Sequence, residues 1–133
     1  MFQIDQVYKR RDLHEKYGGQ QQGGISTPAN HPFIFLFSSK SGKNYGYEDG
    51  WNSNGHYLYT GEGQEGDMQF VRGNKAIRDH QKDGKSLYLF EYVDRGYVRF
   101  IGEMVCWKIH EKSGLDIKGR LRKMIVFELK PAN

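Results

Sequence analysis

The chain has 133 residues, a formal net charge of +4 and an aromatic content of 14%. This length suits one compact domain, and we expect residues 1–133 to form it. The longest wholly apolar run, residues 33–37, is far too short to cross a bilayer. The lone Cys106 can form neither an internal disulfide nor, by itself, a thiolate metal site. These features predict a cytoplasmic protein.

The first half of the chain is predicted to contain a helix and two strands. Residues 2–16 have a partly periodic apolar pattern and are expected to form a helix, alone or after a short strand. A glycine-rich loop then precedes residues 33–37 (FIFLF), which are typical of a buried strand. Residues 56–60 (HYLYT) alternate well enough for a second, short strand.

The second half opens with a predicted helix. Gly73 and Asn74 favour its start, helix-forming residues continue through Lys82, and Gly84 favours its end. We therefore expect one or two short helices beside a larger sheet.

Three strands are predicted to follow, at residues 86–93, 96–109 and 122–129, with turns at residues 94–96 and 112–114. Aromatic residues alternate with aliphatic ones at strand spacing, so we expect them in the core. They are Phe33, Phe35, Phe37, Tyr88, Phe90, Tyr92, Phe100 and Phe127. The predicted fold class is α+β, mostly β, and a small, mixed or barrel-like β fold fits best because closure removes exposed edges.

The positive charge is concentrated in the second half of the chain. Residues 1–67 contain 6 Lys and Arg against 8 Asp and Glu, a net charge of −2. Residues 68–133 contain 14 Lys and Arg against 8 Asp and Glu, a net charge of +6. This distribution is compatible with a polyanionic partner such as nucleic acid, although many soluble domains have a similar imbalance.

Patterns for catalysis and metal binding are weak. Asp116, Glu128 and Lys130 imitate the acid and Glu-x-Lys arrangement with which many nucleases hold a divalent cation, so a small metal-dependent nuclease is one alternative. The five histidines lack a ligand spacing such as His-x-x-x-His, and no Lys-Ser or Lys-Thr follows the glycine-rich loop. We therefore predict no metal, no cofactor and no catalytic residue, and we favour a binding domain.

The loop at residues 46–63 (GYEDGWNSNGHYLYTGEG) combines aromatic rings with glycines. Tyr47 and Tyr59 stand near its two ends, where rings about 7 Å apart can sandwich one planar base and stabilise it by about 1–3 kcal/mol. Asp49 can accept a hydrogen bond from an exocyclic amino group, as a carboxylate does with cytosine. The alternative is that both tyrosines belong to the core beside a long hairpin.

Residues 47–61 (YEDGWNSNGHYLYTG) resemble the pocket segment of SRA domains (SET- and RING-associated domains), in which Tyr-x-Asp is followed further on by Tyr-Thr-Gly. The segments YGGQQQGGIS, RGNKAI and GYVRFIGEM occur in the order of that family, so the resemblance covers most of residues 17–129. The chain looks especially like the SRA-like N-terminal halves of bacterial modification-dependent restriction endonucleases, whose C-terminal half is an HNH nuclease. No HNH signature is present, and the chain would be the DNA-reading half alone.

The resemblance implies a PUA-like curved β barrel that binds duplex DNA and flips out a cytosine modified at C5, with a 5-methyl or 5-hydroxymethyl group. Tyr47 and Tyr59 would stack on the flipped base. Thr60 and Gly61 would contact its Watson–Crick edge. The implied role is to direct modification-dependent restriction.

The sequence departs from the SRA pattern in two places. Eukaryotic SRA domains have two consecutive acids after Tyr-x, whereas Gly50 follows Asp49 here, so Asp49 or a backbone carbonyl would meet the cytosine amino group. Trp51 would then form a pocket wall. The linker GEGQEGDMQF is too short for the finger that reads the opposite strand of a CpG site, so strict hemimethylated-CpG recognition is not implied.

Three segments are predicted to make the remaining contacts with DNA. A loop of three glutamines between glycine pairs would insert into the gap left by the flipped base, or else face solvent. Cations of the predicted helix and of the run KGRLRK would contact phosphates, although the run would equally suit a solvated loop. The residues are Gln20, Gln21, Gln22, Arg72, Asn74, Lys75, Arg78, Lys118, Arg120, Arg122 and Lys123. A PUA-like reader of another mark on DNA or RNA is the alternative among binding domains.

Overall fold

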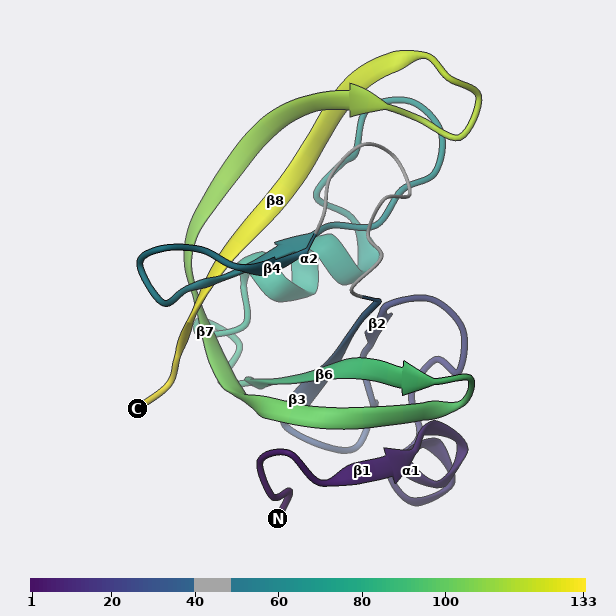
Figure 1. Ribbon diagram of the computed structural model, residues 1–133, viewed down its shortest axis with the longest axis vertical. Helices are drawn as coiled ribbons and strands as arrows, with labels where there is room; N and C mark the ends of the chain where they lie inside the picture. Colours follow the sequence, from purple (N-terminus) through teal and green to yellow (C-terminus); the bar gives the residue numbers. More distant parts are fainter. Residues whose placement is uncertain (40–48) are drawn as a thin grey trace.

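The computed structural model describes residues 1–39 and 49–133. Within these ranges, eight strands form one strongly curved sheet flanked by two short helices (Figure 1). The elements are β1 (Val7–Lys9), α1 (Arg10–Tyr17), β2 (Ile25–Ser26), β3 (Phe33–Ser38), β4 (Gly50–Trp51), β5 (Tyr57–Thr60), α2 (Arg72–Arg78), β6 (Ser86–Asp94), β7 (Tyr97–Leu115) and β8 (Leu121–Pro131). The predicted α+β, mostly β class is confirmed. Neither described helix is long and apolar enough to cross a membrane.

The sheet has the order β2-β3-β6-β7-β8-β5-β4, with β1 paired to β7. Backbone pairing among the described strands ends at β2 and β4, so the expected closure into a barrel is not observed. The sheet is strongly curved instead, because β7, which is 19 residues long, pairs with β6 over its first part and with β8 over the rest. Bulges interrupt both pairings, and each bulge bends its strand. The arch of β7 and β8 encloses α2 (Figure 1).

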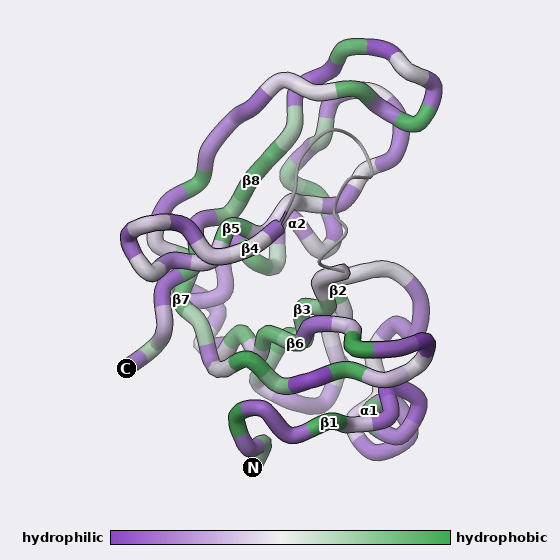
Figure 2. The backbone as a smooth tube through the Cα atoms, in the orientation of Figure 1, coloured by the Kyte–Doolittle hydropathy of each residue, from purple (hydrophilic) through white to green (hydrophobic). Residues whose placement is uncertain are grey.

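Strand β3, next to the edge strand β2, separates two cores, and all of its residues are buried. Ile34 and Leu36 belong to an aliphatic cluster that includes Ile77 of α2. The alternate residues, the phenylalanines of β3, belong to an aromatic cluster with Leu13 of α1. Because both faces are covered, β3 has no polar face, and the apolar colouring of the inner strands in Figure 2 reflects this burial. The predicted aromatic core is confirmed, with Tyr88 and Tyr92 half-buried at its edge.

Element boundaries differ from the sequence prediction in several places, and the helix expected within residues 2–16 spans only Arg10–Tyr17, after the short strand β1. The predicted helix in the second half is shorter, because α2 ends at Arg78. The predicted turn at residues 112–114 is wrong, because β7 continues through Leu115. The turn lies instead where the Asp116 carboxylate accepts hydrogen bonds from the N–H groups of Lys118 and Arg120, at 2.9 and 3.0 Å. Such side-chain bonds to nearby backbone are a strong cause of turns.

Candidate functional site

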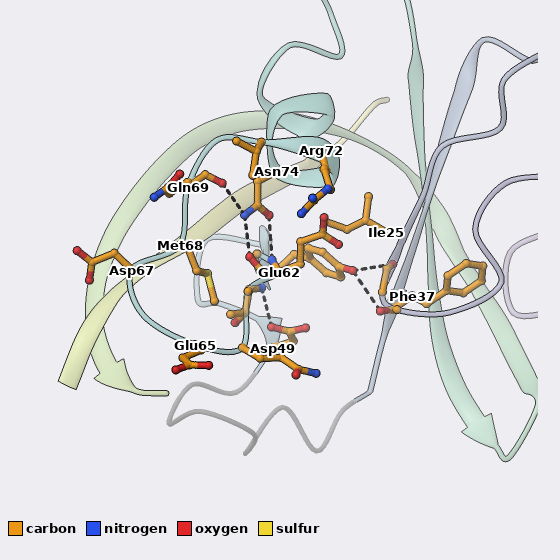
Figure 3. A pocket seen from close by; sticks show the side chains of 18 of the residues that line it. Ile25, Phe37, Asp49, Glu62, Glu65, Asp67, Met68, Gln69, Arg72 and Asn74 are labelled. Carbon is orange, nitrogen blue, oxygen red and sulfur yellow. Dashed lines mark hydrogen bonds between the residues drawn. The ribbon is translucent and has the colours of Figure 1, made fainter. Parts of the chain in front are cut away.

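A pocket of about 740 Å³ lies between the ends of β2 and β5, the start of α2 and the loop at residues 62–69, which we call the rim loop (Figure 3). Its volume is within the range of small-molecule sites. Asp49, Tyr59, Thr60 and Gly61 all line it. The sequence therefore predicted four residues that the fold brings to one cavity.

Tyr59 forms a buried wall of this pocket and is 3% exposed. Its hydroxyl lies 2.8 Å from the carbonyl oxygen of Gly24 and 3.2 Å from that of Phe37, and donates to them. Burial raises the pKa of Tyr59 well above its ordinary value. A Cβ atom at Gly24 would lie 2.7 Å from the Tyr59 hydroxyl, so this close approach requires glycine. Tyr59 therefore joins β5 to the glycine-rich loop before β2.

Asp49 is held at the pocket by two hydrogen bonds. Its Oδ1 accepts from the Thr60 N–H at 2.8 Å, and its Oδ2 accepts from the Ser38 hydroxyl at 2.9 Å. Burial raises the pKa of Asp49, and the hydrogen bonds from Thr60 and Ser38 oppose that shift. An ionised carboxylate has about four acceptor positions, so Asp49 retains acceptor capacity for a ligand.

The other two predicted pocket residues are not part of the described cavity. Trp51 pairs with Tyr57 across β4 and β5, and their rings meet edge to face at 5.2 Å between centroids. Trp51 is 51% exposed and does not line the pocket, so the predicted wall at this position is wrong. Tyr47 lies outside the described residues, and its predicted stacking role stays a prediction.

Asn74 is a support of the pocket rather than a DNA contact, because its side chain is only 1% exposed. Its Nδ2 donates to the carbonyl oxygens of Glu62 and Gln69 at 2.8 and 3.0 Å, and its Oδ1 accepts from the Glu62 N–H at 2.8 Å. A Cβ atom at Gly61 would lie 2.8 Å from that Oδ1. Asn74 thus fixes both ends of the rim loop, and the prediction that it contacts DNA is corrected.

Arg122 is likewise buried, at 4% exposure, and the prediction that it contacts phosphate is corrected. Its Nη1 donates to the carbonyl oxygens of Gly63 and Gly66, at 3.0 and 2.9 Å. Asp116 holds the same loop from the β7–β8 turn by accepting from the Gly66 N–H at 3.0 Å. Backbone hydrogen bonds, that from Gly66 foremost, lower the pKa of Asp116.

The remaining predicted cations are exposed and lie near the pocket. Arg72 lines it directly, and the other side chains lie on α2 or near the β7–β8 turn. Several have acidic neighbours: Arg78 donates to Asp79 at 2.9 Å, for example. Exposed pairs of this kind contribute little to stability. The set is Arg72, Lys75, Arg78, Lys118, Arg120 and Lys123.

The glutamine loop is ordered by its neighbours. Gln20 is engaged with Thr27, whose N–H donates to the Gln20 Oε1 at 2.7 Å, whereas Gln21 and Gln22 are exposed. The predicted insertion of this loop into DNA stays a prediction. Sequence reasoning missed the residue that shapes this loop, Arg10 of α1, which donates to the carbonyl oxygens of Gln20 at 3.2 Å and Gly23 at 2.8 Å.

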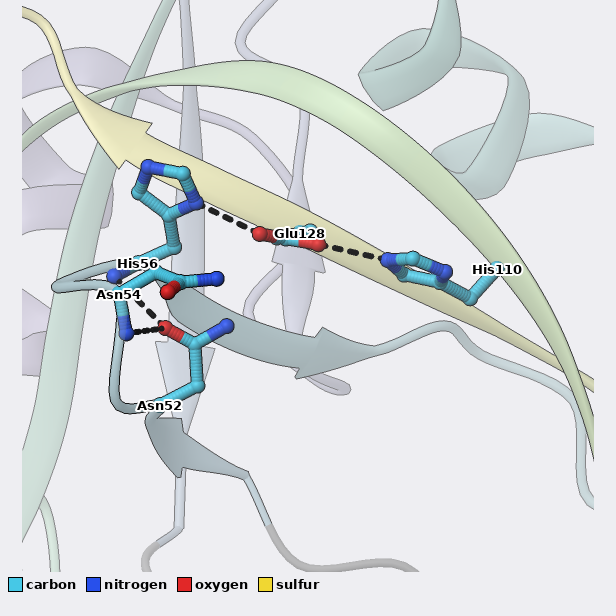
Figure 4. Close-up of polar contacts among 5 residues, drawn as sticks. All are labelled: Asn52, Asn54, His56, His110 and Glu128. Atoms are coloured by element: carbon cyan, nitrogen blue, oxygen red, sulfur yellow. Dashed lines mark hydrogen bonds and ion pairs between the residues drawn. The ribbon is translucent and has the colours of Figure 1, made fainter.

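A second polar cluster, also missed, lies on the sheet (Figure 4). The Glu128 carboxylate of β8 accepts from Nδ1 of His56 at 2.6 Å and from Nε2 of His110 at 2.7 Å. The two histidines are far apart in the chain, and no spacing pattern could have revealed their meeting. Hydrogen bonds from His56 and then His110 lower the pKa of Glu128 to about 2.

The alternative nuclease arrangement has no support in this geometry. Strand β8 carries Glu128 away from the turn that holds Asp116, by about 20 Å at roughly 3.3 Å per residue. Lys130 is exposed beyond Glu128 on the same strand. Within residues 1–39 and 49–133, no group of three or more His, Cys, Asp or Glu side chains is arranged to hold a metal ion.

Comparisons with known proteins relate this chain to a family. The model of the family described as "ScoMcrA-like, SRA domain" matches residues 4–133. One similar structure is that of the sulfur binding domain and SRA domain of ScoMcrA complexed with phosphorothioated DNA. Its sequence is 26% identical, its TM-score is 0.78, and the match covers 98% of this chain and 40% of that chain. A second similar structure is that of the Type IV phosphorothioation-dependent restriction endonuclease ScoMcrA. Its sequence is 25% identical, its TM-score is 0.77, and the match covers 98% of this chain and 28% of that chain.

A more distant structure shares the fold. The SRA domain of SUVH5 in complex with hemi-methylated CG DNA is 20% identical, with a TM-score of 0.69, over 98% of this chain and 88% of that chain. The chain thus spans less than half the length of the two ScoMcrA structures that it matches. A search of curated protein sequences found no match.

Proposed function

The chain belongs to the family of ScoMcrA-like SRA domains, and from this membership we propose that it binds duplex DNA and receives a flipped, modified cytosine in the pocket beside Asp49 and Tyr59. The resemblance to SRA domains found in the sequence is confirmed by the family match. We also propose that the domain is not itself catalytic, and that it directs a restriction nuclease carried elsewhere to modified DNA.

The observation that carries this proposal is the position of Asp49. Its carboxylate lies at a cavity of base-binding size, between Ser38 and Thr60, with acceptor capacity that suits the amino group of cytosine. Flipping costs a few kcal/mol of lost stacking and pairing, which the contacts in the pocket must offset. A C5 methyl group that fills otherwise empty space contributes on the order of 1 kcal/mol.

Exposed cations on both sides of the pocket support the duplex part of the proposal. Arg72 and Lys75 at α2, and Lys118 and Arg120 at the β7–β8 turn, would contact phosphates, while Gln21 or Gln22 would occupy the gap left by the base. Phosphate contacts release counterions, so we expect the affinity for DNA to fall steeply as the salt concentration rises.

We expect the protein to bind a duplex with one 5-methylcytosine or 5-hydroxymethylcytosine more tightly than the same duplex with plain cytosine. Replacement of Asp49 by asparagine should weaken binding of the modified duplex by about tenfold, or 1.4 kcal/mol, because the amide nitrogen presents a donor where the cytosine amino group needs an acceptor. Fluorescence anisotropy titrations at fixed salt would measure this change.

Asp83→Asn is the matched control, because Asp83 is exposed after α2 and does not line the pocket. It removes the same charge and should leave the preference for the modified duplex unchanged. Equal binding of the wild type to plain and modified duplexes would contradict the proposal.

A further inference from the structure

The pocket presents acids to any group that enters it. Glu62, Glu65 and Asp67 lie along the rim loop, and Asp49 lies near the end of β5 (Figure 3). Among the described lining residues, Arg72 alone is cationic. A ligand inside the cavity therefore meets more negative than positive charge, although the DNA around it is itself a polyanion.

Backbone hydrogen bonds fix several of these carboxylates in place. Oε2 of Glu62 accepts from the Gly73 N–H at the start of α2, at 3.0 Å. Oδ1 of Asp67 accepts from the Lys123 N–H at 2.7 Å. These hydrogen bonds hold the carboxylates of Glu62 and Asp67 in fixed positions, so the two side chains cannot readily turn away from an anionic ligand. Glu65 differs, since it pairs with Lys118 at 3.0 Å where both side chains are 55% exposed.

We infer that the pocket selects neutral modified cytosines and rejects anionic modifications. This inference rests on the proposed function and specifies its substrate class. A 5-methyl or 5-hydroxymethyl group is uncharged, and the cytosine amino group donates to carboxylates. A 5-carboxyl group is anionic at neutral pH and would face Asp49 or the rim loop acids at short range in a partly desolvated site, where like charges repel strongly.

The same reasoning applies to a phosphorothioate linkage, the modification in the DNA bound by the ScoMcrA structure. A phosphorothioate diester carries a negative charge, as an ordinary phosphate diester does. Charge therefore gives the acidic cavity no reason to favour a phosphorothioate linkage over an ordinary one. A phosphorothioate without cytosine modification should therefore add no affinity for this chain.

The test compares four duplexes of one sequence, containing plain cytosine, 5-methylcytosine, 5-carboxylcytosine or one phosphorothioate linkage. We expect the wild type to bind the 5-carboxylcytosine duplex at least about tenfold more weakly than the 5-methylcytosine duplex, and the phosphorothioate duplex no better than the plain one. Glu62→Gln keeps a side-chain acceptor for the Gly73 N–H but removes one charge, so it should reduce the ratio between 5-methyl and 5-carboxyl affinities.

Glu103→Gln on β7 is the matched control, since Glu103 is exposed and does not line the pocket; its affinity ratio should equal that of the wild type. A preference for 5-methylcytosine with equally tight binding of 5-carboxylcytosine would overturn the inference and leave the proposed function intact. Tighter binding of the phosphorothioate duplex than of the 5-methylcytosine duplex would also overturn the inference. An unchanged ratio between 5-methyl and 5-carboxyl affinities in Glu62→Gln would do the same. Equal binding of the plain, 5-methyl and 5-carboxyl duplexes would overturn both.

Discussion

Replacement of Arg10 by alanine is expected to lower the free energy of unfolding by about 3 kcal/mol and to loosen the glycine-rich loop at residues 18–24. Arg10 is 8% exposed, and all of its described hydrogen-bond partners are uncharged. Truncation would leave the buried Nε2 of His14 and three part-buried oxygen acceptors without this donor, and an unsatisfied buried acceptor costs more than the loss of the bond itself. It would also remove the guanidinium that lies 3.9 Å from the centre of the Phe37 ring.

Arg11→Ala provides a matched control. Arg11 is the next residue of the same helix, but its side chain is 67% exposed and its ion pair with Glu15 is long, at 3.8 Å. We expect a change of under about 0.5 kcal/mol there. Urea unfolding would measure both variants, and hydrogen exchange of residues 18–24 would report the loop. Equal losses in the two variants would show that Arg10 does not support the loop in the way described.

The loop matters to the pocket because Arg10 and Tyr59 hold adjacent residues of it. Nη1 of Arg10 donates to the Gly23 carbonyl, and the Tyr59 hydroxyl donates to that of Gly24. His14 completes the arrangement, since its Nε2 accepts from Nε of Arg10 at 2.9 Å while its Nδ1 contacts the Gly18 carbonyl at 2.9 Å. Burial lowers the pKa of His14, so the neutral form that accepts from Arg10 is favoured. Helix α1 thereby sets the position of one pocket wall.

The sequence could predict those parts of the site that are local in the chain. Tyr59, Thr60 and Gly61 are consecutive, and a loop of glycines and aromatics marks their neighbourhood. The supports could not be predicted, because their partners are remote: Arg10 donates to Tyr92, and Ser38 donates to Asp49, which is 11 residues further along the chain. A pattern in one segment contains no information about which distant segment lies beside it.

Residue type alone was also misleading where burial decides the role. Arg122 belongs to a basic run, and residue type alone therefore predicts that it contacts DNA. Side chains alternate along β8, however, and Arg122 is buried between exposed Leu121 and exposed Lys123. Asn74 was assigned by the same logic and is buried against the rim loop. The fold class followed from strand alternation, whereas the curvature of the sheet depends on bulges in β6 and β7 that alternation does not reveal.

Replacement of Glu128 by glutamine is expected to lower the free energy of unfolding by about 2 kcal/mol at pH 7, because each of its oxygens accepts a hydrogen bond from a histidine. The loss should depend on pH. The pKa of Glu128 is lowered from 4.5 to about 2 in the folded protein, so the carboxylate binds protons less readily there than in the unfolded chain. Its stabilisation is therefore complete above pH 4.5 and is lost as the pH falls through about 2.

Urea unfolding of the wild type and Glu128→Gln between pH 7 and pH 2 would test this expectation, with the two curves converging at the acid end. Glu111→Gln is the control, because Glu111 lies on β7 with a side chain 69% exposed, and its effect should be small at every pH. A difference between wild type and Glu128→Gln that persists undiminished at pH 2 would mean that packing, not charge, is lost. His56 immediately precedes β5, and Glu128 pairs with Leu58 of that strand, so the cluster fixes the strand that delivers Tyr59 and Thr60 to the pocket.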